Sequence, residues 1–184
     1  MFNQLRIGFD VDDVVNNFMN TTLEIYNERN DAQLNLEMFH EYGITSCVER
    51  NIAEKIWEIF YEHELWERMC PAPHSASVIK DFVQRGHQVY FVSACDARTH
   101  EDKSRWLCAN YPFVPIENHI YTYNKGLLKL DLLIDDNPEH FKGGAFARVL
   151  VDKPWNREAS EFKYEYKIKD LSELSGIVTK EEKI

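Results

Sequence analysis

Two groups of acidic residues each follow a short apolar segment, and they are the residues in this chain best suited to chemistry. Asp10-Val11-Asp12-Asp13 comes after Leu5-Arg6-Ile7-Gly8-Phe9, and Asp135-Asp136 comes after Leu132-Leu133-Ile134. Uncompensated like charges at this spacing repel each other by roughly 4 kcal/mol near a protein surface. A divalent cation relieves that repulsion, and a set of oxygen ligands indicates Mg²⁺. These acids therefore predict a site for a metal ion and a phosphate group.

The first acidic group also suits covalent chemistry. Asp10 and Asp12 are two positions apart, so their side chains face the same way in an extended chain. One carboxylate can attack phosphorus while the other handles the proton of the leaving group. Taken alone, this pair is a weak motif, because acidic loops match it by chance.

Ser93 and Lys125 have side chains that suit a bound phosphate. The hydroxyl of Ser93, which closes an apolar segment, can donate to a phosphoryl oxygen. Lys125 can neutralise charge that develops on a transferring phosphoryl group, with Lys129 as a competitor a few residues on. Taken alone, Ser93 is better explained as a turn residue and Lys125 as a solvated loop residue.

Other basic positions leave two interpretations open. Arg98 and Lys103 follow Ser93, and each suits either phosphate contact or closure of the site. For Lys103 an exposed position on a helix is an equally good explanation. Lys153-Pro154-Trp155-Asn156-Arg157 fits a loop on the substrate side, but a rigid turn is the preferred interpretation.

The composition limits the class of protein. The chain has 184 residues, is 44% hydrophobic and carries a formal net charge of −10, which argues against a nucleic acid polymer as partner. The four cysteines are far apart and form no CxxC pair, which indicates reduced thiols. With neither a signal peptide nor a membrane span in evidence, we expect a cytoplasmic protein without a membrane partner. The sequence leaves a homodimer open.

Alternating strands and helices predict the elements that position these residues. We expect strands over residues 5–10, 88–92, 118–121, 131–134 and 148–151. We expect helices over residues 14–30, from a Ser46-x-x-Glu49 capping box to about 63, over 75–85, and from Thr99-x-x-Asp102 through 107. A last helix opens at 170–174, before a frayed tail at 180–183. This alternation is typical of an α/β protein with a parallel sheet. An all-helical stretch interrupts it after the first strand. We therefore predict a core of residues 1–14 and 73–184 and an inserted helical cap of residues 15–72.

The order of these motifs resembles the haloacid dehalogenase-like superfamily of phosphatases. Gly8-Phe9-Asp10-Val11-Asp12 is similar to its first motif, Val92-Ser93 to its second, Lys125 to its third and Asp135-Asp136 to its fourth. Within it, the chain most resembles the 5′(3′)-deoxyribonucleotidase family, whose Leu-Leu-Ile-Asp-Asp-Arg-Pro segment is close to residues 132–138 here. The resemblance covers about residues 5–157 and implies a Rossmann-like parallel sheet flanked by helices, with a small helical cap. Two residues depart from the pattern: Asp13 stands where many members have Gly, and Asn137 where Arg is frequent.

The resemblance implies a Mg²⁺-dependent phosphomonoesterase for nucleoside monophosphates, deoxyribonucleotides in particular. Asp10 would be the nucleophile, and Asp12 would protonate the leaving oxygen and then activate water. Mg²⁺ would be held by Asp10, by Asp12 through its backbone carbonyl, and by Asp135 or Asp136, with Asp135 preferred. Ser93 and Lys125 would bind the phosphate.

The predicted cap is rich in aromatic residues. Phe18 and Trp57 match positions where the resembling family lines its base pocket, and Tyr42 is a third candidate. Stacking a base on such rings contributes about 1–3 kcal/mol per base. Most of the other rings are better explained as packing within the cap.

Other functions compete with this interpretation. A phosphatase for another small ester, such as a sugar phosphate, uses the same chemistry, and only the aromatic cap argues against it. A phospho-accepting signalling domain of the receiver type also groups acids, a hydroxyl and a lysine around Mg²⁺, but it has no helical insert of this size. A binding protein without activity is disfavoured because every motif position is filled.

Overall fold

The computed structural model describes residues 3–158 and 163–182. Its centre is a six-stranded sheet in the order β3-β2-β1-β4-β5-β6, in which every neighbouring pair is parallel. The strands are β1 (Arg6–Phe9), β2 (Gln88–Ser93), β3 (His119–Tyr121), β4 (Leu132–Asp135), β5 (Ala147–Val151) and β6 (Tyr166–Ile168). The predicted α/β class with a parallel sheet is confirmed.

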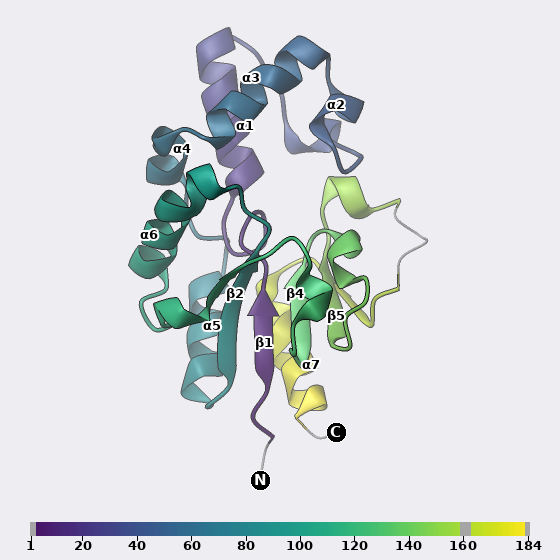
Figure 1. The fold of residues 1–184 in the computed structure, drawn as a ribbon. Coiled ribbons are helices and arrows are strands. Elements are labelled where there is room, and N and C mark those ends of the chain that lie inside the picture. The colour runs from purple at the N-terminus through teal and green to yellow at the C-terminus, as the bar shows by residue number, and fades with distance from the viewer. Residues whose placement is uncertain (1–2, 159–162, 183–184) are drawn as a thin grey trace.

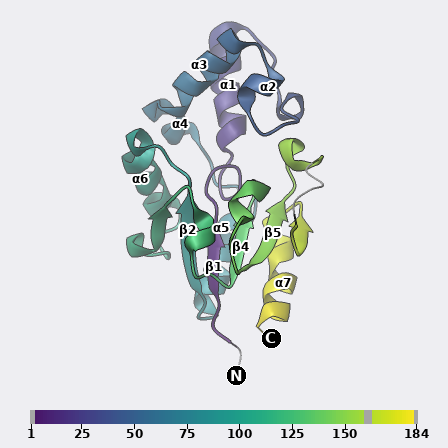
Figure 2. The ribbon, with the colours of Figure 1, turned by 45° about the vertical axis from the view of Figure 1, so that its right-hand side comes forward.

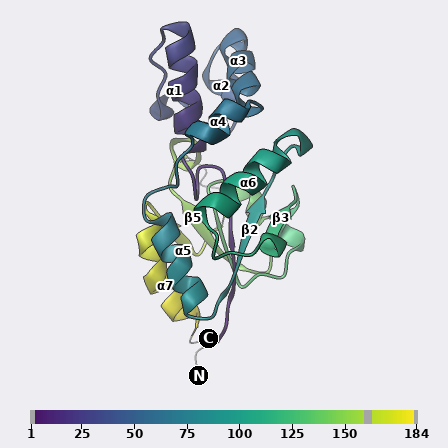
Figure 3. The ribbon, with the colours of Figure 1, turned by 90° about the vertical axis from the view of Figure 1, so that its left-hand side faces the viewer.

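The central strands are apolar because both faces of the sheet are covered. On one face, Ile7 and Phe9 belong to a core that includes side chains from α5 (Ser75–Gln84), α6 (His100–Asn110) and α7 (Leu174–Glu181). Figure 3 shows α5 and α7 side by side against the sheet. On the other face, short 3₁₀ turns and loops form a second core, and Gly8 faces it. A Cβ atom added to Gly8 would lie 2.5 Å from Leu130 Cδ1, so a larger residue does not fit without a shift.

Helices α1 to α4, with the loops between them, form a separate layer that we call the cap. They are α1 (Phe18–Asn30), α2 (Ile44–Cys47), α3 (Arg50–Phe60) and α4 (His63–Arg68). The cap has its own apolar core, which includes Leu23, Ile56 and Leu65. Figures 1 and 2 show it above the end of the sheet to which the strands point. No helix within the described residues has the length and apolar character needed to cross a bilayer.

Several predicted boundaries in the cap are wrong. The helix predicted from residue 14 begins at Phe18, because Asp13 adopts φ 60° and the following residues connect the core to the cap. The helix predicted to end at about residue 63 is α3, which already ends at Phe60, and α4, which begins at His63, was not predicted. The capping box at Ser46 is absent, because Ser46 lies inside α2 and Glu49, the residue before α3, makes no side-chain cap bond.

Other differences lie in the core. Thr99 does precede α6, but its hydroxyl donates to the Asp96 carbonyl rather than accepting from the helix. Strand β6 was not predicted. The tail was predicted to fray, yet Lys180 and Glu181 belong to α7 and Glu182 is buried against Arg85. Lys183 lies outside the described residues.

Candidate active site

Three carboxylates meet where β1 and β4 end. Asp10 directly follows β1, Asp135 is the last residue of β4, and Asp136 comes next. The Asp10 amide still donates to the Ile134 carbonyl at 2.8 Å, which holds the two strand ends together. Ligand oxygens of the three acids all lie within 4.8 Å of one another. The parallel sheet thus brings together the two acidic groups that lie more than a hundred residues apart in sequence, at the edge where α/β proteins bind ligands.

Lys125 lies between two of these carboxylates. Its Nζ donates to Asp10 Oδ1 at 2.5 Å and to Asp135 Oδ2 at 2.7 Å, and the residue is 1% exposed. Burial lowers the pKa of Lys125, but the two carboxylates outweigh this effect and raise it overall. The next residue, Gly126, lies so close to the backbone at Lys142 that an added Cβ would be 2.1 Å from its carbonyl oxygen. A glycine there lets the loop approach closely enough to deliver the lysine.

The cluster carries more negative charge than Lys125 neutralises. Burial raises the pKa of Asp10 to about 6, although Lys125 partly offsets the effect. Burial and then the charges of Asp135 and Asp10 raise the pKa of Asp136 well above its usual value. Burial also acts on Asp135, but Lys125 and His140 outweigh it and lower the pKa of Asp135. This electrostatic imbalance suits a cation.

A second lysine joins the other two predicted residues. Lys103, on α6, donates from Nζ to Asp12 Oδ2 at 2.5 Å and to Ser93 Oγ at 2.7 Å. It is 2% exposed, so the alternative of a surface lysine is wrong. Lys103, Trp106 and Leu107 have the spacing of one helix face, and that periodicity was a signal for its burial. Arg98 is exposed instead, paired with Asp96 and lying 3.6 Å from the centre of the Tyr61 ring.

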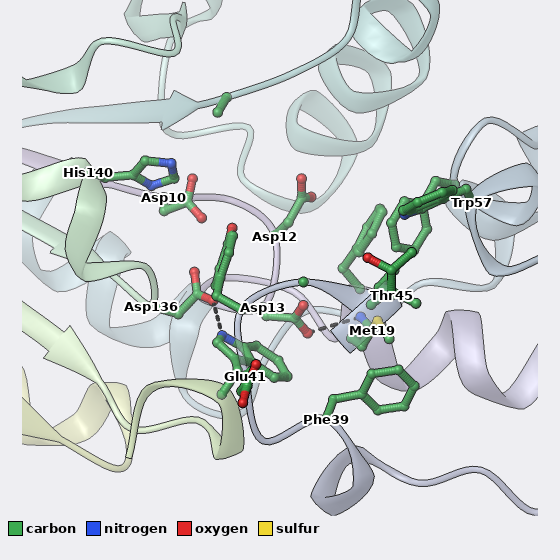
Figure 4. A pocket seen from close by; sticks show the side chains of 17 residues that line it. Asp10, Asp12, Asp13, Met19, Phe39, Glu41, Thr45, Trp57, Asp136 and His140 are labelled. Carbon is green, nitrogen blue, oxygen red and sulfur yellow. Dashed lines mark hydrogen bonds between the residues drawn. The ribbon is translucent and has the colours of Figure 1, made fainter. Parts of the chain in front are cut away.

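Asp10, Asp12, Asp13 and Asp136 form the floor of a cavity of about 400 Å³ between core and cap. Figure 4 shows Asp10, Asp12 and Asp136 on one side of it, with Trp57 and Phe39 across from them. The predicted residues Phe18, Tyr42 and Trp57 all line the cavity, together with Met19, Glu41, Gly43, Ile44, Thr45 and Phe60 from the cap.

The three predicted rings differ in their surroundings. Phe18 packs against Phe60 with ring centres 4.8 Å apart, whereas the Trp57 residue is 40% exposed. Tyr42 is more exposed still, yet desolvation and then the charge of Asp136 raise the pKa of its hydroxyl.

Trp155 and His140 contact the acidic cluster and were not among the predicted site residues. Trp155 lies in a 3₁₀ turn (Pro154–Asn156) after β5, lines the cavity, and donates from Nε1 to Asp136 Oδ2 at 2.7 Å. The sequence of residues 153–157 favours a rigid turn, and only the position of this segment directly after a strand indicates a site residue. His140 also lines the cavity, with Nδ1 2.9 Å from Asp135 Oδ1. Lys129, the competitor of Lys125, is exposed.

Both departures from the family pattern have structural consequences. Asp13 has φ 60°, the left-handed region that favours glycine, which explains why Gly is frequent at this position. Its Oδ1 accepts from the Met19 amide at 3.0 Å, and burial raises its pKa to about 7. Asn137 donates its backbone amide to Asp135 Oδ1 at 2.9 Å, and its side chain accepts from the Glu139 amide at 3.0 Å. Asn137 thus orients Asp135.

The residues present fit a magnesium ion. Among the described residues, the cluster that could hold a metal consists of carboxylates alone, which favours Mg²⁺ over Zn²⁺. Both oxygens of Asp135 already accept hydrogen bonds, from Lys125 and from the Asn137 amide. In Asp136, Oδ2 accepts from Trp155, and no residue in the described part of the chain donates to Oδ1. Asp136 therefore has the freer oxygen.

Comparison with known proteins agrees with this geometry. The family model described as "5' nucleotidase, deoxy (Pyrimidine), cytosolic type C protein" matches residues 3–181. A 5′(3′)-deoxyribonucleotidase of Clostridium acetobutylicum is 29% identical over 163 residues, which cover 87% of this chain and 88% of that protein.

Solved structures show the same fold at low sequence identity. The magnesium-bound putative HAD hydrolase YfnB of Bacillus subtilis is 14% identical with a TM-score of 0.59, covering 96% of this chain and 99% of that one. A haloacid dehalogenase-like protein of Agrobacterium tumefaciens is 7% identical with a TM-score of 0.70, covering 97% and 99%. The family and fold predicted from the motifs are confirmed. Because the family model spans nearly the whole sequence, the chain belongs to this family of deoxy-type 5′ nucleotidases within the haloacid dehalogenase-like fold.

Proposed function

We propose that this protein is a Mg²⁺-dependent phosphomonoesterase that hydrolyses deoxyribonucleoside 5′- or 3′-monophosphates through an aspartyl-phosphate at Asp10. The observation that best supports the proposal is the arrangement of charged residues on the cavity floor. Asp10 and Asp12 lie there with their own lysines, Lys125 and Lys103, beneath a cap whose aromatic residues enclose a space of about 400 Å³. Membership of a nucleotidase family supports the substrate class.

The residues divide the reaction between them. Asp10 Oδ attacks phosphorus while Asp12 protonates the leaving nucleoside oxygen, and Asp12 then takes a proton from the water that hydrolyses the aspartyl-phosphate. Lys103 and Ser93 donate to phosphoryl oxygens, and Lys125 balances the charge of Asp10 as phosphate approaches. This is a nucleophile, an acid–base group and anion-stabilising donors in one site.

Mg²⁺ would be held by a carboxylate oxygen of Asp10, the backbone carbonyl of Asp12 and Oδ1 of Asp136. We place Asp136 ahead of Asp135, the acid preferred from the sequence, because the oxygens of Asp135 are occupied by Lys125 and the Asn137 amide. When bound, the metal would supply positive charge between two anionic groups, the nucleophile and the phosphate.

The cap supports nucleotides over sugar phosphates as substrates. Phe18 and Trp57 line the cavity on the cap side, where a base attached to a phosphate on the floor can stack. A sugar phosphate has no flat ring to stack there. The receiver-type alternative is excluded because the chain belongs to a nucleotidase family.

A phosphate-release screen tests the proposal. The purified protein is incubated with Mg²⁺ and deoxyribonucleoside 5′- and 3′-monophosphates, ribonucleoside monophosphates and sugar phosphates, with Asp10→Asn as the background control. We expect the highest kcat/KM for a deoxyribonucleotide; a higher value for a sugar phosphate contradicts the substrate class. A homodimer and a cytoplasmic location stay predictions, which light scattering and cell fractionation test.

A further inference from the structure

The connection between core and cap runs beside the acid–base residue. Two segments, residues 14–17 entering the cap and 69–72 leaving it, lie antiparallel to each other. The Asn17 amide donates to the Cys70 carbonyl at 3.2 Å, and the Ala72 amide donates to the Val15 carbonyl at 2.8 Å. Asn16 pairs with Pro71 in this connection and is 1% exposed. A polar side chain buried this deeply needs partners.

The partners of Asn16 fix the orientation of its side-chain amide. Oδ1 accepts two backbone hydrogen bonds, from the Asp13 amide at 2.9 Å and from the Phe18 amide at 3.1 Å. An amide nitrogen cannot accept a hydrogen bond, so a flipped side chain would lose both. Nδ2 must therefore point the other way, and it lies 3.4 Å from Asp12 Oδ1. That distance is long for a hydrogen bond, as is common for catalytic contacts before substrate binds.

The catalytic loop also satisfies the first turn of α1. Asp13 Oδ1 accepts from the Met19 amide at 3.0 Å, and Asn16 accepts from the Phe18 amide. Asn17, the residue directly before α1, makes no cap bond with its side chain, which accepts from the Cys70 amide at 2.8 Å instead. The start of α1, which carries Phe18, is therefore tied to the loop that carries Asp12.

We infer that Asn16 is a positioning residue that couples the cap to proton transfer, because one side-chain amide contacts both the Asp12 carboxylate and the first residue of the helix that carries Phe18. The inference rests on the proposed function, in which Asp12 moves the proton. Movement of α1 relative to the core changes the contact between Asn16 and Asp12. The Asp12 side chain is then held in position for proton transfer only while the cap covers the carboxylates of the cavity floor.

The variant Asn16→Asp separates the two contacts. It keeps an oxygen for the Asp13 and Phe18 amides but places a second oxygen where the N–H faces Asp12. We expect kcat for a deoxyribonucleotide to fall roughly 10- to 100-fold, the cost of misplacing a catalytic group. The Tm should fall because the new carboxylate is buried beside Asp12, so kcat is compared well below the Tm of the variant. The first turnover of p-nitrophenyl phosphate, whose leaving group needs little protonation, should stay within about threefold of the wild type.

Asn17→Ala is the matched control. It removes a hydrogen bond to the Cys70 amide within the same connection, and no contact with Asp12 is lost. Its kcat should stay within about threefold of the wild type even where its Tm falls. A kcat for Asn16→Asp within about twofold of the wild type overturns the inference. So does an equal loss on the nucleotide and on the first turnover of the nitrophenyl ester.

A second readout needs no turnover. In a double-mutant cycle on the free energy of unfolding, Asn16→Ala and Asp12→Ala should be non-additive because the two side chains contact each other. Additive effects overturn the inference. A wild type that releases no phosphate from any nucleotide overturns the proposed function instead, and the cycle still tests the contact.

Discussion

At the residue scale, each of the two carboxylates that we propose to react, Asp10 and Asp12, is paired with a different lysine. Lys125 contacts Asp10 and Asp135, whereas Lys103 contacts Asp12 and Ser93. Both lysines are almost completely buried, which is costly for a cation unless carboxylates compensate it. If both lysines bind phosphoryl oxygens as proposed, this pairing already holds their ammonium groups in place, and little reorganisation is needed when substrate binds.

Replacing Lys103 tests its part in phosphate binding. Lys103→Met keeps the buried aliphatic stem but removes the donor to Asp12 and Ser93, so kcat/KM should fall roughly 10²–10³-fold. Lys80→Met, at an exposed lysine on α5, is the control and should leave kcat/KM unchanged. Equal kcat/KM values for the two variants would show that Lys103 has only a structural role.

In the proposed mechanism, Asp10 carries the covalent step. Asp10→Asn keeps the shape of the side chain but supplies no competent nucleophile, so phosphate release should fall by on the order of 10³-fold or more. Circular dichroism and Tm should show a folded protein. If the variant keeps a tenth of wild-type turnover, the aspartyl-phosphate mechanism is wrong.

At the scale of elements, α1 and α3 position two of the rings that line the cavity. Phe18 begins α1 and Trp57 lies on α3, and both line the cavity while the other face of each helix packs in the cap core. Phe18→Ala and Trp57→Ala should each remove about 1–3 kcal/mol of stacking with the base. The loss should appear in kcat/KM for nucleotides and be smaller for p-nitrophenyl phosphate.

The measurement is the ratio of the two kcat/KM values in wild type and in each variant. Tyr164→Ala, near the start of β6 and outside the cavity lining, is the control for loss of an aromatic ring. An unchanged ratio in both cavity variants means that the rings only pack the cap. The nucleotide assignment would then lose its main physical support.

A buried histidine at the opposite end of the sheet predicts a pH dependence of stability. His87 Nδ1 accepts from the Leu5 amide at 3.2 Å. Its Nε2 lies 2.9 Å from Oε1 of Glu182, the residue that directly follows α7. Burial lowers the pKa of His87, although Glu182 partly offsets the effect. Below the ordinary pKa of about 6.5, the unfolded chain then binds a proton that the folded chain does not, so the free energy of unfolding falls.

Urea unfolding at two pH values, one above and one below this ordinary pKa, tests the effect. Wild type should lose more stability on acidification than His87→Gln, whose amide oxygen can still accept from Leu5. His40→Gln, at an exposed histidine, should lose as much as the wild type. Equal losses in wild type and His87→Gln would show that His87 does not titrate in this range.

At the scale of the whole molecule, the proposed metal site would link the end of the sheet to both stability and activity. Asp10, Asp135 and Asp136 repel one another in the folded protein, so a bound cation should stabilise the fold by mass action. We expect EDTA to abolish activity, Mg²⁺ to restore it, and Mg²⁺ to raise the Tm of the wild type. The rise in Tm should be much smaller in Asp136→Asn than in the control Asp81→Asn on α5. Full activity in metal-free buffer, or restoration by zinc alone, contradicts the magnesium site.

The sequence by itself determined the class of fold and the acidic residues of the site. Short apolar segments that end in Asp10, Ser93 and Asp135 are local signals. In a parallel sheet the carboxyl ends of strands meet at one edge, so their order already implies proximity. The helical insert was visible for a similar reason, because it interrupts a regular alternation of elements.

Only the tertiary structure decided which of several equivalent side chains belong to the site. Lys103 and Arg98 follow the same strand, yet one is buried against Asp12 and the other is exposed. Trp155 reaches Asp136 from another strand end, and the hydrogen bonds of Asp135 leave Asp136 with the freer oxygen. Strand β6 is a three-residue edge strand with one buried side chain, too short for a clear pattern. Each of these outcomes depends on contacts between residues distant in sequence, which local periodicity does not encode.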